Sequence, residues 1–276
     1  MHFLKHTSYS LFIALLLAGI SLLSSCEKNT GIQPTTPKPA CRPTSIVYGS
    51  LELKYEYNTD DQLIKFSDGV TFIKFEYTDS RVTKLIYYRD NDETKVNLTD
   101  QIEYNSKGQW MRHTYIEPLT SGNKVIQENT AEYDPNGNRV KIIAYVNGKP
   151  VKIYTFEYSN GNLIKQIIEQ YGARVLSYTY EYDMNHENKL TNFEPLIWFG
   201  YPYTQLGMES TPSTNMLKKV NTFDSNGSLS QTADFAYEYN SKGFPTKLTV
   251  SGGDLNGDGQ VDAKDVYVRN YNYDCL

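Results

Sequence analysis

The feature that most constrains this chain is a short internal repeat, an apolar, usually aromatic residue followed by Glu and Tyr, then a turn and an apolar-Lys-apolar run. Its clearest copy occupies residues 156–165, and the other triplets end at tyrosines 57, 77, 104, 133, 182 and 239. From Tyr57 to Tyr182 the copies follow one another at intervals of 20 to 29 residues. Such a period is typical of one β-hairpin plus its return connection.

Residues on either side of each turn have the pattern of strands. In residues 51–57 the odd positions are Leu or Tyr and the even positions are Glu or Lys. This alternation places the apolar set on one face of a strand and the charges on the other. The turns are rich in Asn, Asp, Gly and Pro, which favour short hairpin loops; they lie at 58–61, 105–108, 134–137, 159–161 and 240–243. We therefore predict an all-β chain built as a long antiparallel hairpin meander.

The 24 tyrosines provide apolar area while their hydroxyls can still reach polar partners. Core and cross-strand packing is our main interpretation of this Tyr-rich pattern, and a platform on which carbohydrate rings stack is the alternative.

Composition sets the class of protein. A chain of 276 residues with 39% hydrophobic content can bury one substantial core, which we place in a single domain at 45–276. A net charge of -5, with acidic and basic residues interspersed, argues against a nucleic-acid partner. The four histidines are scattered and no Gly-rich phosphate loop is present, so we assign no catalytic residue.

The N-terminus has the features of an export signal at residues 1–25. Lys5 and His6 precede an apolar stretch at 11–23 that is short for a membrane span, and Leu-Ser-Ser-Cys at 23–26 resembles the lipobox of bacterial lipoproteins. That resemblance implies that Cys26 carries acyl chains, which hold the protein on a membrane. Glu27 after the cysteine favours a location at the outer membrane, but it does not indicate which leaflet holds the protein. An ordinary secretory signal with an incidental cysteine is the alternative.

Residues 26–44 read as the lipidated cysteine and a Pro/Thr-rich tether, because four prolines keep such a segment extended. With Cys26 acylated, Cys41 and Cys275 remain near the two ends of the domain. An oxidising envelope favours a disulfide between them, with two free thiols as the alternative.

The repeat is interrupted at about 190–220. This stretch contains a cluster of aromatic residues around two prolines, including Trp198, Phe199, Tyr201 and Tyr203. Long irregular insertions in a compact sheet are usually lids, plugs or binding loops. We interpret it as a segment that covers one face of the sheet, with a short helix at 196–199, and keep an exposed aromatic ligand-binding loop as the alternative.

Residues 254–265 match the EF-hand calcium loop, whose twelve positions supply oxygen ligands to a hard cation. The predicted calcium ligands are Asp254, Asn256, Asp258, Gln260 through its backbone carbonyl, Asp262 and Asp265. The opening resembles the calcium loop of dockerin modules, but the residues that follow have the pattern of a strand instead of a helix. We expect calcium to act as a structural clip; an acidic turn without an ion is the alternative.

Glu132-Tyr133-Asp134-Pro135-Asn136-Gly137 resembles the YD repeats of Rhs-type shell proteins. Together with the lipobox and the interruption, the chain is similar over about residues 45–275 to a family of Bacteroidota lipoproteins of unknown function with a porin-like sheet. The resemblance implies a large, strongly curved sheet or partial barrel, and it brings no catalytic residues.

These features favour a lipid-anchored, non-enzymatic binding or structural module of the cell envelope, with a glycan or envelope protein as ligand. The second hypothesis is an enzyme of envelope glycan metabolism with two converging carboxylates. The third is a barrel that spans the membrane, which would require an apolar outer girdle.

Overall fold

The computed structural model describes residues 41–192, 213–252 and 266–275. The strands are β1 (Cys41–Tyr48), β2 (Leu51–Tyr57), β3 (Leu63–Ser67), β4 (Phe72–Thr78), β5 (Arg81–Tyr88), β6 (Val96–Tyr104), β7 (Trp110–Glu117), β8 (Lys124–Tyr133), β9 (Arg139–Val146), β10 (Lys149–Ser159), β11 (Asn162–Gln170), β12 (Ala173–Glu187), β13 (Asn215–Phe223), β14 (Leu229–Tyr239), β15 (Pro245–Ser251) and β16 (Val266–Cys275). A short 3-10 helix, η1 (Lys189–Asn192), follows β12.

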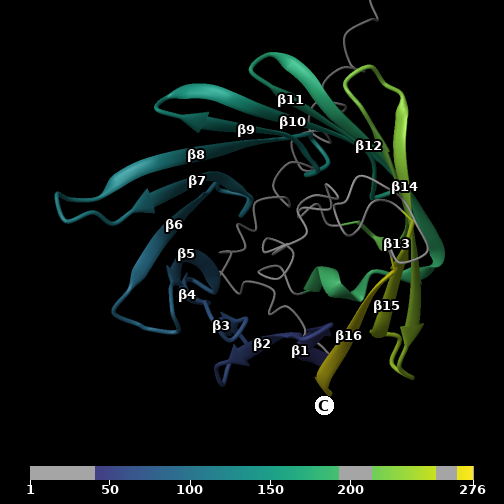
Figure 1. The fold of residues 1–276 in the computed structure, drawn as a ribbon, viewed down its shortest axis with the longest axis horizontal. Helices are drawn as coiled ribbons and strands as arrows, with labels where there is room; N and C mark the ends of the chain where they lie inside the picture. The colour runs from purple at the N-terminus through teal and green to yellow at the C-terminus, as the bar shows by residue number, and fades with distance from the viewer. Residues whose placement is uncertain (1–40, 193–212, 253–265, 276) are drawn as a thin grey trace, which may run out of the picture. The chain divides into compact units, whose positions relative to one another are not determined.

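The strands form one closed antiparallel barrel in which each strand pairs with its sequence neighbours and β16 pairs with β1 (Figure 1). The predicted all-β hairpin meander is therefore confirmed, and the sheet closes completely where a curved sheet or partial barrel was expected. Closure leaves no strand with an unpaired edge, which removes the usual route to edge-to-edge aggregation. In the described part of the chain, no helix has the length and apolar composition needed to cross a membrane.

The repeat turns all lie at one end of the barrel, which we call the repeat rim. They connect β2 to β3, β4 to β5, β6 to β7, β8 to β9, β10 to β11 and β14 to β15. At 105–109, Asn105 Oδ1 accepts hydrogen bonds from the backbone N–H groups of Lys107 and Gln109, at 2.9 and 3.0 Å. Gly108 closes this turn at φ +80°, a conformation that favours glycine.

The outer face of the barrel carries the repeat glutamates, and each is paired in register with a basic residue on the next strand. The pairs are Glu56 with Lys65, Glu76 with Lys84, Glu103 with Arg112, Glu132 with Lys141, Glu157 with Lys165, Glu181 with Lys219 and Glu238 with Lys247. The Lys in the apolar-Lys-apolar run is thus the cross-strand partner of the triplet's Glu. Exposed pairs of this kind stabilise the folded protein by about 0–1 kcal/mol each. Their main effect is therefore to specify the strand register and the face of the sheet that contacts water.

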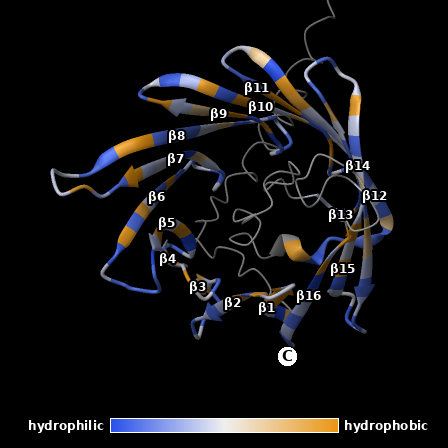
Figure 2. Cartoon of the chain, in the orientation of Figure 1, coloured by the Kyte–Doolittle hydropathy of each residue, from blue (hydrophilic) through white to orange (hydrophobic). Residues whose placement is uncertain are grey.

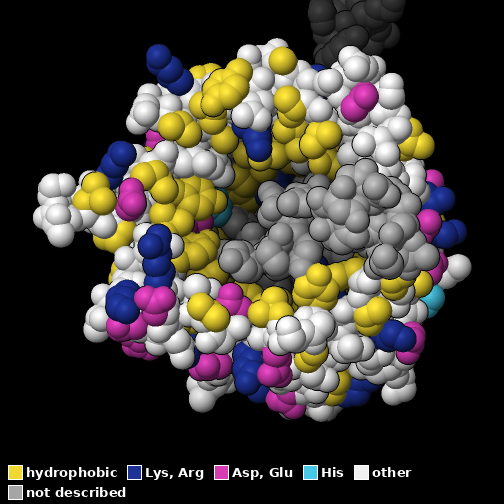
Figure 3. Space-filling model, in the orientation of Figure 1, with side chains coloured by type: hydrophobic (Ala, Val, Ile, Leu, Met, Phe, Trp, Pro, Cys, Tyr) yellow, Lys and Arg dark blue, Asp and Glu magenta, His cyan; other side chains and the backbone are white. Residues whose placement is uncertain are grey.

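Hydrophilic and hydrophobic residues alternate along the strands (Figure 2), and the buried, apolar half of this alternation forms the inner face. First residues of the triplets are buried here, among them Tyr55, Phe75, Ile102, Phe156 and Tyr180. Two apolar clusters result, one centred on β2–β7 and the other on β10–β16. Figure 3 shows hydrophobic side chains gathered around the hollow of the barrel and most charged side chains around its periphery.

The last tyrosine of each triplet coincides with a β-bulge. In all seven repeats the register shifts between Glu and Tyr, so that the return strand holds one extra residue. Near the start of the return strand, a backbone carbonyl accepts a hydrogen bond from a tyrosine of the next hairpin. Tyr77 Oη, for example, donates to the Leu63 carbonyl at 2.9 Å.

The same hydroxyl-to-carbonyl bond recurs around the repeat rim at 2.7 to 2.9 Å. The further pairs are Tyr57 with Pro43, Tyr104 with Val82, Tyr133 with Trp110, Tyr182 with Leu163 and Tyr273 with Pro245. Burial raises the pKa of Tyr182 to about 12, so its hydroxyl stays protonated and able to donate at neutral pH. Together with the Tyr77 bond, these pairs make six bonds, which we call the tyrosine girdle, and each ties an even-numbered strand to the strand before it.

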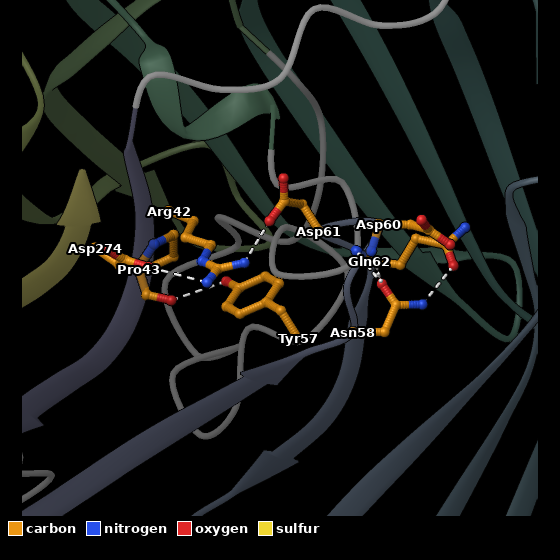
Figure 4. Close-up of polar contacts among 8 residues, drawn as sticks. All are labelled: Arg42, Pro43, Tyr57, Asn58, Asp60, Asp61, Gln62 and Asp274. Carbon is orange, nitrogen blue, oxygen red and sulfur yellow. Dashed lines mark hydrogen bonds and ion pairs between the residues drawn. The ribbon is translucent and has the colours of Figure 1, made fainter. Parts of the chain in front are cut away.

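Closure of the barrel depends on the pairing of β1 with β16 and on a disulfide at its end. Cys41 and Cys275 face each other in register and are joined by the bond that the sequence predicts, across a separation of 234 residues. Beside it the Arg42 guanidinium makes ion pairs with Asp61 and, at 2.9 Å, with Asp274 (Figure 4). The first and last strands are thereby locked together at the repeat rim.

Two expected boundaries differ from the structure. β1 begins at Cys41, so residues 41–44 of the predicted tether belong to the barrel. β13 begins at Asn215, so the interruption expected at 190–220 is shorter at its C-terminal end. The register shift between Asp183 and Glu187 obscures the alternation there, because a bulge moves side chains to the other face. The predicted helix at 196–199 lies outside the described residues.

Replacing both Cys41 and Cys275 by Ala is expected to lower the free energy of unfolding by up to about 5 kcal/mol, because the bond restricts a very long loop in the unfolded chain. Urea unfolding of the variant, compared with the wild type under oxidising and reducing conditions, measures this effect. Equal urea midpoints for all three samples would contradict it.

Tyr77→Phe removes only the hydroxyl that donates to the Leu63 carbonyl. We expect a loss of about 1 kcal/mol in the free energy of unfolding, the usual contribution of one such hydrogen bond. Tyr171→Phe is the matched control, because Tyr171 is 77% exposed at the other end of the barrel. If the two variants were equally stable, the tyrosine girdle would have no energetic role at this position.

Candidate functional site

Most of the residues that the sequence singles out lie outside the described residues. These are the predicted calcium ligands Asp254, Asn256, Asp258, Gln260, Asp262 and Asp265, the aromatic residues Trp198, Phe199, Tyr201 and Tyr203, and the lipidation residue Cys26. They stay predictions, whereas the Cys41–Cys275 disulfide is present. Around the predicted calcium loop, Ser251 pairs with Val266, so residues 252–265 connect two paired strands of the last hairpin.

The described ends of the aromatic insertion are held at the repeat rim. Asn188 N–H donates to the Thr214 carbonyl at 2.8 Å, which brings the start and end of the insertion together. Ser213 Oγ accepts from Leu163 N–H at 3.1 Å and donates to the Tyr182 hydroxyl at 2.8 Å. The insertion therefore leaves and re-enters the barrel at one fixed place beside the tyrosine girdle.

A buried acid–base pair interrupts the apolar inner wall. Asp100 on β6 and His113 on β7 are 2% and 5% exposed, and the Asp100 Oδ2 to His113 Nδ1 distance is 2.8 Å. Asp100 has the same strand parity as buried Ile102, and it lies opposite Leu85 on β5. Both side chains therefore belong to the inner face, where most residues are apolar or tyrosine.

Aromatic rings and one guanidinium surround this pair. The Trp110 and His113 ring centroids are 4.5 Å apart in an edge-on arrangement, and Tyr115 stacks on the other side at 6.2 Å. Arg139 lies over the Trp110 ring at 5.3 Å, and this arginine is itself buried. We call Asp100, Trp110, His113, Tyr115 and Arg139 the inner-wall cluster.

Burial dominates the electrostatics of the cluster. Desolvation raises the pKa of Asp100 above its ordinary value, although the hydrogen bond and charge of His113 act in the opposite direction. Burial, with the nearby Asp100 charge, also raises the pKa of Tyr87. A carboxylate with a perturbed pKa and a specific partner marks a candidate functional site.

The geometry of the cluster limits what it can do. Asp100 fixes the orientation of the imidazole through Nδ1, as a carboxylate does for a general base. Among the buried side chains of the described ranges, however, Asp100 is the only acidic one, so these ranges contain no second buried carboxylate for glycoside hydrolysis. One Asp100 oxygen, Oδ1, has no hydrogen-bond partner in the part of the chain that the structure describes.

Sequence reasoning missed the inner-wall cluster. His113 was set aside as one of four scattered histidines, and Asp100 lies 13 residues earlier on another strand. One signal was available: Asp100 occupies the parity of Ile102 and Tyr104 in residues 96–104, where the alternation calls for an apolar residue.

Comparison with known proteins finds similarity in fold. No protein-family model and no curated protein matches the chain. A crystal structure of a porin-like protein from Bacteroides uniformis ATCC 8492 covers 87% of this chain and 98% of its own, with 15% identity and a TM-score of 0.57. A porin-like protein from Bacteroides vulgatus ATCC 8482 covers 85% and 99%, with 14% identity and a TM-score of 0.49. At these identities the first likeness shows a shared fold alone, in agreement with the porin-like sheet expected from the sequence, and the second carries no argument.

Asp100→Asn is expected to change how stability depends on pH. The folded protein holds the Asp100 proton more tightly than the unfolded chain, where the carboxyl titrates near 3.8. The free energy of unfolding therefore contains a component that falls as pH rises from about 3.8 through the raised pKa, and the variant lacks it. Urea midpoints of both proteins across this range measure the difference.

Asp234→Asn serves as the control, because the Asp234 side chain is 59% exposed. Its pH profile should run parallel to that of the wild type. A parallel profile for Asp100→Asn as well would contradict the assigned burial of the carboxylate.

Proposed function

We propose that this protein is a lipid-anchored module of the bacterial cell envelope whose barrel lies in water beside the outer membrane and binds a glycan or an envelope protein without catalysis. The observation that carries the proposal is the charged outer face of the barrel. The third hypothesis, a spanning barrel, needs an apolar band facing lipid instead.

Charges recur along the strands as well as near the repeat rim. Lys84 and Glu76 are 3.1 Å apart, and Lys247 and Glu238 are 2.7 Å apart. Further from the rim, Lys74 pairs with Glu93 at 2.7 Å. A lysine facing the middle of a bilayer costs roughly 2–4 kcal/mol, so a ring of such residues favours water strongly. A lipid on Cys26 then supplies the membrane attachment that the barrel wall does not.

The inner-wall cluster supports binding over the alternative of a glycan-metabolising enzyme. That alternative needs two acidic side chains converging in one cleft. In the described ranges the glutamates of the repeats face outward beside lysines or arginines, and Asp100 stands alone as a buried acid. The aromatic inner wall suits a carbohydrate ring, since aromatic faces stack on apolar ring surfaces.

Calcium belongs to the same proposal as a structural ion at 254–265. The residues present are hard oxygen donors at EF-hand spacing, and the loop connects β15 to β16, the strand that closes the barrel. Calcium bound there would hold the last hairpin together.

Cys26→Ser is expected to release the protein from the membrane fraction, because the acylated thiol is the proposed anchor. Residues 27–276 should also stay monodisperse without detergent, as measured by size-exclusion chromatography. Cys41→Ser is the matched cysteine control and should remain membrane-bound. Extraction that requires detergent for the Cys26 variant would favour the spanning barrel.

Calcium is expected to raise the melting temperature of the protein relative to a chelator, because an ion that binds only the folded state stabilises it by mass action. Asp254→Ala and Asp258→Ala should abolish the shift, and the exposed Asp234→Ala should keep it. The absence of any calcium shift in the wild type would reduce the loop to a simple turn.

The ligand itself is tested by the same thermal melt in calcium with a panel of envelope polysaccharides. A shift with one polysaccharide supports a glycan-binding module. No shift with any of them argues for a protein ligand or a structural role.

A further inference from the structure

The inner-wall cluster contains the one buried carboxylate of the described ranges. The inner face is mainly apolar and tyrosine, with uncharged polar side chains such as Gln166 and Thr222, whereas Asp100 puts a carboxylate there at 2% exposure. Places where a chain departs from its own local pattern are commonly functional or strained. The burial of the Asp100 carboxylate on this face therefore requires a chemical explanation.

Its two oxygens have different surroundings. Oδ2 is 2.8 Å from His113 Nδ1, and Oδ1 is buried without a hydrogen-bond partner in the described ranges. A buried acceptor left in this way is unfavourable, and a carboxylate oxygen more so than a neutral one. Oδ1 is thus an acceptor for which a hydrogen bond from a donor outside the described chain would be favourable.

We propose that the inner wall at β6 and β7 is a subsite for a neutral carbohydrate, one hydroxyl of which donates a hydrogen bond to Asp100 Oδ1. The inference rests on the proposed binding function and assigns a place and a ligand class to it. Asp100 is the ligand-contacting residue, and His113 is a positioning residue that holds the carboxylate through Oδ2.

The charge around the cluster selects a neutral ligand over a cation. Arg139 lies 5.3 Å from the Trp110 ring, and that ring lies 4.5 Å from the His113 ring. A guanidinium at this range, in a largely buried setting, opposes a second positive charge beside Asp100. A sugar hydroxyl donates without bringing charge.

The aromatic ring that a sugar could reach beside the pair is Tyr115, which is only partly buried, whereas Trp110 is buried and lies under Arg139. Trp110 and Tyr115 flank the imidazole at centroid distances of 4.5 and 6.2 Å. Aromatic side chains combine a large apolar surface with fixed geometry, which suits the C–H face of a sugar ring. A pyranose offers both groups at once, hydroxyls at its edge and an apolar face.

Imidazole NMR of the exported protein tests this subsite directly. His2 and His6 lie in the proposed signal peptide, so His113 and His186 are the histidines of the mature chain. His186 is an internal control, because its side chain is 44% exposed and it pairs with Asp183 at 2.7 Å on the β12 strand. The probes are glucose, galactose, mannose and N-acetylglucosamine, with the cation glucosamine for comparison.

The expected result is a saturable shift of the His113 resonances with at least one neutral sugar, a weaker effect of glucosamine, and no shift at His186. Asp100→Asn should weaken binding of that sugar about tenfold or more, the usual loss for a hydrogen bond to a charged acceptor. Asp234→Asn should bind as the wild type does. If Asp100→Asn fails to fold, the titration of the wild-type protein still tests the subsite, because it requires only the shift of the His113 resonances.

Other outcomes separate this inference from the proposed function. If a polysaccharide raises the melting temperature but no sugar moves His113, the subsite is wrong and glycan binding lies elsewhere on the protein. If His113 shifts equally in Asp100→Asn, the sugar does not bind through Oδ1. If neither measurement detects a carbohydrate, the subsite and the glycan-binding proposal are both overturned, and solvent is the donor at Oδ1.

Discussion

Pairing between β1 and β16 is the interaction on which the rest of this structure depends. In a meander of hairpins, each strand forms backbone hydrogen bonds with its sequence neighbours, but the first and last strands each keep one unpaired edge. Only the pairing of these two edges completes the hydrogen-bond ladder. Once the ladder closes, every strand has one face toward the interior and one toward the outside. The disulfide between Cys41 and Cys275 sits at the end of this seam and secures it.

In the closed barrel, the residues of the repeat have two structural roles. The Glu and the Lys of one hairpin meet on the outer face, while the tyrosine at the bulge reaches the carbonyl of the preceding return strand, as Tyr104 does with Val82 at 2.8 Å. A single short motif thus specifies the register within a hairpin and the bond between hairpins. The result is a barrel with a charged exterior and an apolar, phenol-rich interior. This arrangement is inverted relative to a barrel that faces lipid, and it is the reason that we propose Cys26 as the membrane anchor.

Local features of the fold could be predicted from the sequence, and those that depend on distant strands could not. Alternation in residues 51–57 and the Asn-Gly turns predicted the meander, and the positions of Cys41 and Cys275 predicted their bond. Complete closure depends on curvature summed over all sixteen strands, which no single repeat encodes. The pairing of Asp100 with His113 depends on the register of β6 and β7, which a bulge beside Tyr104 shifts.

The most direct test of this account is the accessibility of the outer lysines in the native membrane. Outer-membrane vesicles can be opened so that both leaflets are accessible, treated with a water-soluble amine reagent and analysed by mass spectrometry. A water-facing barrel predicts modification of Lys84, Lys141, Lys165 and Lys247, which lie on the outer face, to the same extent before and after detergent is added. Protection of these lysines until detergent dissolves the bilayer would show that the barrel wall is embedded in lipid, and would contradict the account.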